Sequence, residues 1–199
     1  MISGAGRLRR IVCAAPVLLL AVALQTAADD AQWDFARLMT QLAQVETSRA
    51  RYSEVKRVSM LKEPLILSGT LSYARPDRME KRQVSPFAEV IRVEGERLTV
   101  ERDGSTRSIS LRGVPLIDAL VQSLRATLAG DAAALQSLYT VRVDGARNRW
   151  RLLLTPRDPE VAGAVRRITI AGSGARLSRI EILEPGGDSS VMTIQEDSP

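Results

Sequence analysis

The chain has 199 residues, of which 28 are Lys or Arg, 23 are Asp or Glu and none is His, so its formal net charge is +5. The absence of histidine excludes serine–histidine and cysteine–histidine nucleophile pairs, histidine acid–base catalysis and imidazole metal ligands. Basic and acidic residues alternate along the chain and do not cluster with stacking aromatic residues, which argues against nucleic-acid binding.

The N-terminal segment has the layout of a secretory signal peptide. Three arginines lie within residues 7–10, an apolar stretch covers residues 11–24, and small residues occupy positions 26–28. The apolar stretch has about fourteen residues, fewer than the roughly twenty that a helix needs to cross a bilayer. We therefore predict cleavage after Ala28 and export to the periplasm, with a retained anchor as the alternative.

Removal of residues 1–28 changes both the charge and the cysteine content. It takes away three arginines and no acid, which leaves 25 basic and 23 acidic residues and lowers the net charge from +5 to +2. It also removes the single cysteine, Cys13. The mature chain, residues 29–199, then has no disulfide and no thiolate metal site, and its length suits a single domain with one apolar core.

The mature chain opens with the pattern of an amphipathic helix. Between Trp33 and Val45 apolar residues recur at spacings of three and four, and Asp29 or Asp30 is expected to cap the helix. Beyond Arg51 the period changes to two, and apolar residues alternate with polar ones over residues 65–73, which indicates a strand with one apolar face. Glycine-containing turns then separate three short strands at 90–93, 98–102 and 108–111.

A second helical region is predicted from Pro115, interrupted by Gly130 and resumed over residues 131–138. The final third returns to strands, at 139–143, 149–155, 165–170, 177–183 and 190–194. The order of helix, strands, helices and strands favours an α+β domain with an antiparallel sheet over a parallel βαβ sheet.

Motifs that could carry enzyme chemistry have simpler interpretations. Residues 53–56, Ser-Glu-Val-Lys, fit the S-x-x-K pattern of penicillin-recognising enzymes, but the local pattern is that of a strand and no partner motif follows. Several carboxylates, among them Glu94 and Glu101, fall at hairpin ends, where solvated charge is the usual explanation. We therefore predict a protein that is not an enzyme and has no cofactor or metal. A carboxylate enzyme would require two acids converging in one pocket.

Three segments carry a resemblance to a known family. The sequence GTLSYARPDRMEK at residues 69–81 resembles the signature strand of the LolA-like family, periplasmic carriers that move lipoproteins from the inner to the outer membrane. WRLLLTP at residues 150–156 resembles a family strand that ends in proline, and residues 166–187 resemble the closing hairpin. The order of elements agrees over nearly all of the mature chain.

The resemblance implies a fold and a ligand-binding region. The fold would be a strongly curved antiparallel sheet forming an incomplete β-barrel, covered by an N-terminal helix and by a helical lid around residues 115–138. Its concave apolar face would receive acyl chains. The residues expected around this lipid-binding cavity are Leu67, Leu71, Tyr73, Met79, Ile117, Leu120, Leu124, Trp150, Leu152, Leu154, Ile168, Ile170, Ile180 and Ile182. Of these, Ile117, Leu120 and Leu124 could be lid residues or ordinary core, and core is the more usual role for such residues.

Arg75 matches the family arginine that precedes a proline, hydrogen-bonds the lid backbone and holds the cavity closed. The alternative is an arginine that caps a strand end at the surface. The chain departs from the family in two places. It has Met79 and Lys81 where the lipoprotein carriers keep an aromatic residue, and it stops at Pro199 without their further loop and strand. We therefore expect a shortened relative, and leave transfer of whole lipoproteins open.

The predicted function is that of a periplasmic carrier, or chaperone, that is a monomer and does not bind nucleic acid. It would bind the acyl chains of a lipid or lipoprotein in an apolar cavity and move them toward the outer membrane. An inner-membrane donor and an outer-membrane acceptor would be its protein partners. The alternative is a non-catalytic periplasmic adaptor that binds a protein partner through a sheet edge. A carrier needs a roomy apolar hollow under its helices, whereas an adaptor needs a packed core and an exposed edge or patch.

Overall fold

A computed structural model describes residues 33–196 of the chain. The predicted signal peptide, its cleavage site, Asp29 and Asp30 lie outside the described residues. Within this range the chain forms a sheet of eleven strands and four α-helices. The strands are β1 Thr47–Arg57, β2 Leu65–Ala74, β3 Arg78–Ser85, β4 Glu89–Glu94, β5 Arg97–Arg102, β6 Ser105–Ser110, β7 Tyr139–Ala146, β8 Arg149–Pro156, β9 Arg167–Ser173, β10 Arg176–Leu183 and β11 Ser189–Glu196.

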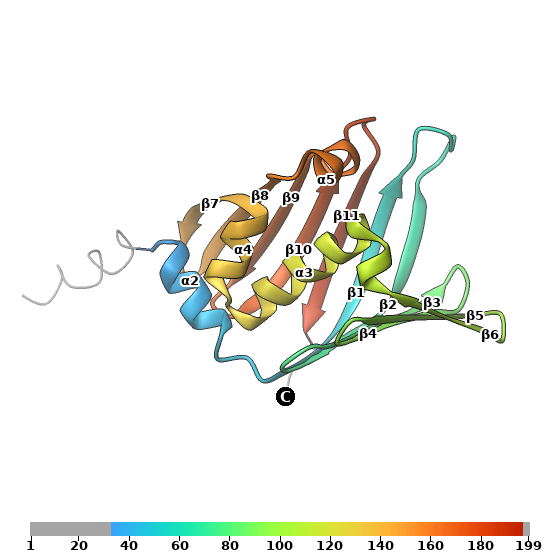
Figure 1. The fold of residues 1–199 in the computed structure, drawn as a ribbon, viewed down its shortest axis with the longest axis horizontal. Helices are drawn as coiled ribbons and strands as arrows, with labels where there is room; N and C mark the ends of the chain where they lie inside the picture. The colour runs from blue at the N-terminus through green and yellow to red at the C-terminus, as the bar shows by residue number, and fades with distance from the viewer. Residues whose placement is uncertain (1–32, 197–199) are drawn as a thin grey trace, which may run out of the picture. The chain divides into compact units, whose positions relative to one another are not determined.

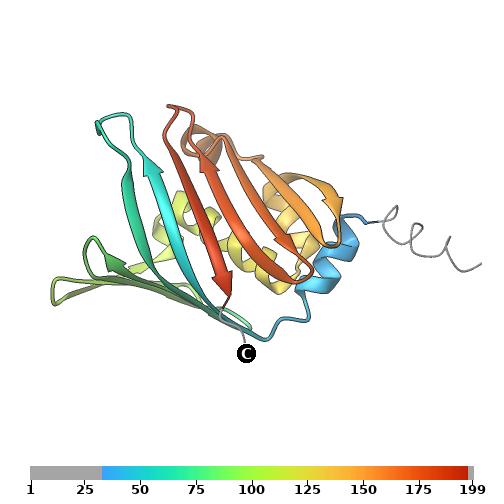
Figure 2. The same ribbon diagram turned by 180° about the vertical axis from the view of Figure 1, so that it is seen from behind.

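The sheet consists of two antiparallel meanders joined in its middle. The strand order is β6-β5-β4-β3-β2-β1-β11-β10-β9-β8-β7. Strands that pair are therefore consecutive in sequence, except for β1 and β11 in the middle. The sheet is curved: Figure 1 shows β7–β11 face on and β4–β6 almost edge on, and Figure 2 shows the opposite face of the same sheet. The predicted α+β class with an open, strongly curved antiparallel sheet is confirmed.

The helices lie on one face of this sheet (Figure 1). They are α2 Phe35–Leu42, α3 Pro115–Ala129, α4 Ala132–Leu138 and the short α5 Pro159–Ala164, with a 3-10 turn at Leu111–Gly113. The N-cap of α2 is Asp34, whose carboxylate accepts a hydrogen bond from the backbone N–H of Arg37 at 2.9 Å. The prediction of Asp29 or Asp30 as its cap is therefore wrong, because the helix begins later than its apolar pattern.

Two separate apolar clusters hold the helices to the sheet. The larger cluster joins α2, α3 and α4 to strands β7, β8 and β9 through Leu38, Leu135, Trp150 and their neighbours. The smaller cluster is formed by Val93, Leu98 and Leu111, against which Ile117 and Val121 of α3 pack. Helix α3 thus contributes Leu120 to one cluster and Ile117 to the other, and spans the distance between them.

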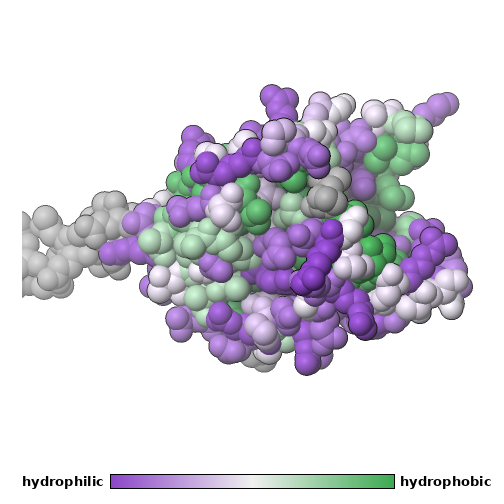
Figure 3. Space-filling view, in the orientation of Figure 1, coloured by the Kyte–Doolittle hydropathy of each residue, from purple (hydrophilic) through white to green (hydrophobic). Residues whose placement is uncertain are grey.

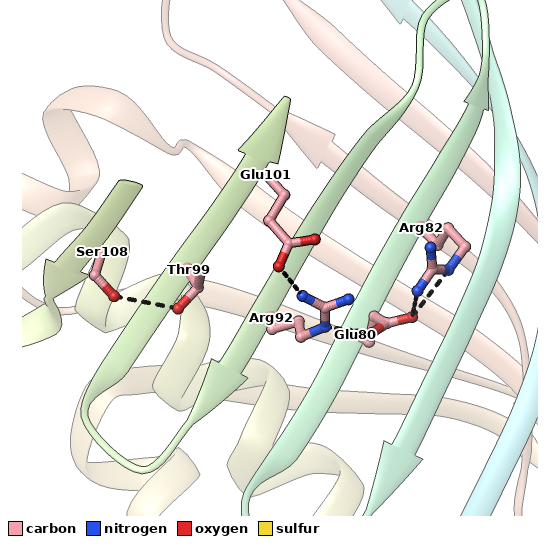
Figure 4. A network of polar contacts seen from close by, with 6 residues as sticks. All are labelled: Glu80, Arg82, Arg92, Thr99, Glu101 and Ser108. Atoms are coloured by element: carbon pink, nitrogen blue, oxygen red, sulfur yellow. Dashed lines mark hydrogen bonds and ion pairs between the residues drawn. The ribbon is translucent and has the colours of Figure 1, made fainter. Parts of the chain in front are cut away.

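The convex face of the sheet between β2 and β6 is polar. Cross-strand pairing aligns Ser72, Glu80, Arg92, Thr99 and Ser108 in one row. The Glu80 carboxylate accepts from Arg92 at 2.7 Å, and its Oε1 lies 3.1 Å from an Arg82 guanidinium nitrogen; Arg92 also pairs with Glu101 (Figure 4). These ion pairs make this face of the sheet polar and suited to contact with water. The helices pack on the opposite, apolar face.

Strand β3 and helix α5 were not predicted as separate elements. The sequence pattern treats residues 69–81 as one segment, whereas a turn at residues 75–77 divides it into β2 and β3. The inward positions of β3 hold Lys81 and the buried Gln83, in addition to Met79. Polar residues at inward positions remove the apolar alternation by which a strand is recognised.

Candidate ligand-binding face of the sheet

The middle of the concave face lies between the two apolar clusters. Tyr52, Leu67 and Ile194 are buried there, with exposed fractions of 4%, 6% and 8%, yet they belong to neither cluster. They come from β1, β2 and β11, the strands at the centre of the sheet. Figure 3 shows apolar surface on the β1–β2 side of the molecule, beyond α3, where no helix covers the sheet. This central region is the candidate binding face.

The fourteen residues predicted to line a cavity fall into three groups. Five of them, Trp150, Leu152, Leu154, Ile168 and Ile170, are buried in the larger cluster, and Leu120, Ile180 and Ile182 pack against it. Met79 and Ile117 pack against the smaller cluster. The remaining four, Leu67, Leu71, Tyr73 and Leu124, belong to neither cluster.

The three groups differ in how accessible they are to a ligand. Trp150 has no exposed surface, and its indole N–H donates to the Gly174 carbonyl at 2.8 Å, so it is held inside packed protein. Leu71 and Leu124 are partly exposed. Of the four residues outside both clusters, Leu71 and Leu124 are therefore placed to contact an acyl chain without rearrangement of the core, whereas Leu67 and Tyr73 are buried.

Arg75 lies at the end of β2 and contacts two helices. Its guanidinium donates to the backbone carbonyl of Ala43, the C-cap of α2, and to that of Ala129, the last residue of α3, at 3.3 Å. Carbonyls at a helix C-terminus lack intrahelical partners and carry partial negative charge, so a cation is stabilising there. The side chain therefore connects the sheet to both helix ends and is half-buried.

A polar group interrupts the apolar concave face at β1 and was missed by sequence reasoning. Lys81 Nζ donates to Glu54 Oε2 at 2.6 Å, and Ser190 Oγ donates to Glu54 Oε1 at 2.6 Å. The Lys81 ammonium also lies 5.0 Å from the centre of the Tyr52 ring. Glu54 is only 6% exposed. The S-x-x-K segment lies in strand β1, so Ser53 and Lys56 face opposite sides of the sheet and are not adjacent.

Two tyrosines on this face keep their hydroxyl protons. Burial, reinforced by the negative charges of Glu54 and Glu89, raises the pKa of Tyr52 to about 12. Burial likewise raises the pKa of Tyr73. Neither hydroxyl has a hydrogen-bond partner among residues 33–196. Buried polar atoms without partners are rare in folded proteins, so each such atom needs an explanation.

A polar hollow lies beside the β4–β5 turn and strand β6. It has a volume of about 460 Å³ and is lined by Glu94, Glu96, Arg97, Ser108, Ile109 and Ser110. Only one of these residues is apolar, so this hollow does not suit an acyl chain. Within the described part of the chain, no cluster of three or more acidic side chains could hold a metal ion, and no helix is long and apolar enough to cross a membrane.

Solved structures with a similar arrangement have little sequence in common with this chain. A LolA superfamily protein from Nitrosomonas europaea is 11% identical, with a TM-score of 0.43, and the match covers 84% of this chain and 96% of that protein. The lipoprotein LppX of Mycobacterium tuberculosis is 13% identical, with a TM-score of 0.43, and the match covers 83% of this chain and 96% of LppX. A chain of the MucA/MucB complex of Pseudomonas aeruginosa is 16% identical, with a TM-score of 0.40, and the match covers 82% of this chain and 56% of that chain.

A comparison with curated proteins gives no match. The comparison with protein families does: residues 25–194 match the family described as outer membrane lipoprotein carrier protein LolA-like. The matched range takes in every strand but the end of β11, and both segments that carry the Arg-Pro and Trp-x-Leu motifs. The chain therefore belongs to the LolA-like family.

Proposed function

We propose that this protein is a periplasmic carrier that binds an acyl chain of a lipid or lipoprotein against the middle of its concave sheet face. The observation that carries the proposal is the division of the apolar interior into two clusters, with Tyr52, Leu67 and Ile194 shielded from water between them but packed in neither. Membership of the LolA-like family supports it. The carrier is not an enzyme, and it acts as a monomer.

Acyl-chain burial on this face supplies a suitable affinity. Each methylene removed from water contributes about 0.8 kcal/mol, so roughly ten methylenes contribute about 8 kcal/mol before the cost of ordering the chain. This free energy corresponds to a dissociation constant that is at best roughly micromolar. Such binding protects a chain during diffusion through an aqueous compartment and still permits release to an acceptor.

Arg75 supplies the latch in this proposal. Its two hydrogen bonds tie the C-terminal ends of α2 and α3 to the end of β2, on the same side of the sheet as the binding face. Opening the helices away from the sheet would break both bonds. Export by the predicted signal peptide would place the carrier between an inner-membrane donor and an outer-membrane acceptor.

An adaptor function is the second candidate, because one end of the sheet exposes apolar side chains. Met60 is 91% exposed, and Leu61, Ile66 and Val84 are 52%, 55% and 62% exposed around the β1–β2 end of the sheet. An adaptor would use such a patch to bind a protein partner. The two functions differ in whether the purified protein retains lipid.

The carrier proposal is tested by purifying the protein without detergent, identifying co-extracted lipid by mass spectrometry and measuring uptake of a fluorescent fatty acid. Leu67→Gln, on the concave face, should weaken uptake about tenfold, a loss of about 1.4 kcal/mol of apolar burial. Ile66→Gln, the adjacent residue on the convex face, should leave uptake unchanged. Absence of both lipid and uptake in the wild-type protein would refute the carrier and favour the adaptor.

A further inference from the structure

The polar group formed by Tyr52, Glu54, Lys81 and Ser190 is unusual for its position. It lies on the concave face, between β3 and β11, among the apolar residues Leu67, Leu71 and Met192 and the polar residues Lys56 and Gln83. A buried carboxylate and a partly buried ammonium are costly to remove from water, and a pair of apolar residues of similar volume would often be as stable. The fold does not need these charges for packing, so they are candidates for ligand recognition.

The register of the sheet brings the group together. Tyr52 and Glu54 occupy successive inward positions of β1, and Lys81 occupies an inward position of β3, one strand away across β2. The residue opposite Tyr52 on β2 is Gly69, which has no side chain to separate β1 from β3. Lys81 therefore reaches across β2 to Glu54 and lies above the Tyr52 ring.

Hydrogen bonding within the group is complete at Glu54 and incomplete at Tyr52. Both Glu54 oxygens accept a hydrogen bond, one from Lys81 and one from Ser190. Tyr52 is only 4% exposed, and its buried hydroxyl has no hydrogen-bond partner in the described part of the chain. With its pKa raised to about 12, this hydroxyl stays protonated and offers a donor at neutral pH. The group lacks an acceptor for that proton.

Three kinds of ligand oxygen could accept the hydrogen bond from the Tyr52 hydroxyl, and they differ in how well they suit this position. A free carboxylate would have to lie beside Glu54 and compete with it for the single ammonium of Lys81. An ether oxygen is a weak acceptor. The carbonyl oxygen of an acyl ester or amide is uncharged, accepts strongly, and stands at the head of the hydrocarbon chain that the surrounding apolar face would hold.

We propose that Tyr52 and Lys81 form a polar subsite that binds the carbonyl of an acylated ligand, with the Tyr52 hydroxyl donating to the carbonyl oxygen and Glu54 with Ser190 holding Lys81 in place. This inference rests on the proposed carrier function and narrows its cargo to acyl esters or amides. Lys81 has 28% of its side chain exposed and Tyr52 is buried, so we place the entrance to the subsite on the Lys81 side.

The test compares two probes of equal chain length, a monoacylglycerol ester and the corresponding monoalkylglycerol ether, each competing with a bound, uncharged fluorescent hydrocarbon. The wild-type protein should bind the ester more tightly, by about 3- to 10-fold, the contribution of one hydrogen bond. Tyr52→Phe keeps the ring beneath Lys81, removes a buried unpaired hydroxyl and should fold normally. It should reduce the ester-to-ether ratio to near one while leaving ether affinity unchanged.

Tyr139→Phe is the control, because it removes a tyrosine hydroxyl from the packed larger cluster, where that hydroxyl donates to the Ala119 carbonyl at 3.3 Å. It should keep the wild-type ratio. Equal affinity of the wild-type protein for both probes would overturn the subsite and leave the carrier function intact, and so would an equal loss of the ratio in Tyr52→Phe and Tyr139→Phe. Failure of both probes to displace the fluorescent hydrocarbon would overturn the subsite, and failure of the hydrocarbon itself to bind would overturn the carrier function as well.

Discussion

At the scale of single residues, Arg75 illustrates why an arginine suits the junction of a sheet and two helices. Its planar guanidinium donates in different directions at once, here to the Ala43 and Ala129 carbonyls, whereas a lysine presents one point charge. Both acceptors are unpaired helix-end carbonyls, so each bond stabilises an end that would otherwise depend on water. The residue acts on the helices rather than on the ligand.

Arg75→Leu is therefore expected to leave uptake of a fluorescent fatty acid nearly unchanged and to accelerate its release by at least about tenfold. The loss of hydrogen bonds from a charged donor, each contributing about 1.5–3 kcal/mol, makes opening of the helices easier. Stopped-flow release into acceptor vesicles would measure the rate. Arg78→Leu is the control, since Arg78 is an exposed neighbour paired with Glu94 at 3.0 Å, and equal release rates for wild type and Arg75→Leu would remove the latch from the proposal.

Arg75 could be predicted because its motif is contiguous in sequence, and resemblance alone was enough to single it out. Glu54 and Lys81 could not, since they are 27 residues apart and meet only through the register of β1, β2 and β3. The sequence held no clear signal for them, because the inward positions of β1 and β3 mix apolar residues with the polar Lys56 and Gln83.

At the scale of elements, helix α3 depends on the glycine that ends it. Gly130 has φ of +68°, a left-handed conformation, and closes α3 as its C-cap. A Cβ at this position would lie 2.7 Å from the Ala43 Cβ and would also overlap the Met39 carbonyl. The glycine thus serves two purposes: it turns the chain from α3 toward α4, and it allows α3 to approach the end of α2.

Gly130→Ala should lower the free energy of unfolding by about 2 kcal/mol or more, because left-handed strain of about 1 kcal/mol adds to the clash with α2. Urea denaturation followed by circular dichroism would measure it. The matched control is Gly113→Ala in the 3-10 turn, where an added Cβ meets nothing within 4 Å and stability should change by no more than about 0.5 kcal/mol. Equal stability of the two variants would contradict this account of the α2–α3 contact.

Most elements were predictable from periodicity, and the two that were missed have different causes. The helices at 115–129 and 132–138 and the strands of the second meander follow regular apolar patterns and a glycine stop. Strand β3 combines Arg78, Lys81 and Arg82 with few apolar residues, and α5 is only six residues long. Tertiary pairing, rather than local preference, forms β3. Helix α5 does have local start signals, since Asp158 is its N-cap and Pro159 lies in its first turn.

At the scale of the whole described domain, the ion-pair network on the convex face makes stability depend on pH. On the convex face, burial opposes ionisation of Glu80, but the hydrogen bonds and positive charges of Arg92 and Arg82 outweigh it and lower the pKa of this carboxyl below its usual 4.5. A carboxyl with a lowered pKa stabilises the folded state above its unfolded pKa and loses that contribution as the pH falls through the folded value.

The wild-type protein should accordingly be more stable than Glu80→Gln at pH 7, and the difference should shrink steadily below pH 4.5. Urea denaturation at a series of pH values would give both free energies. Glu94→Gln, which alters a carboxylate in a pair with 69% of its side chain exposed, should show a much smaller difference at pH 7. A constant gap between wild type and Glu80→Gln from pH 7 to pH 3 would exclude the proposed role of the network.

The pairing of β1 with β11 has a consequence for how the domain is assembled. These two strands are separated by more than 130 residues, yet together they occupy the centre of the sheet. Every other strand pair can form as a local hairpin or short connection, whereas this one awaits nearly the entire polypeptide. Until residues 189–196 are in place, β1 and β10 each present a bare edge, and the floor of the proposed lipid site is split along its length.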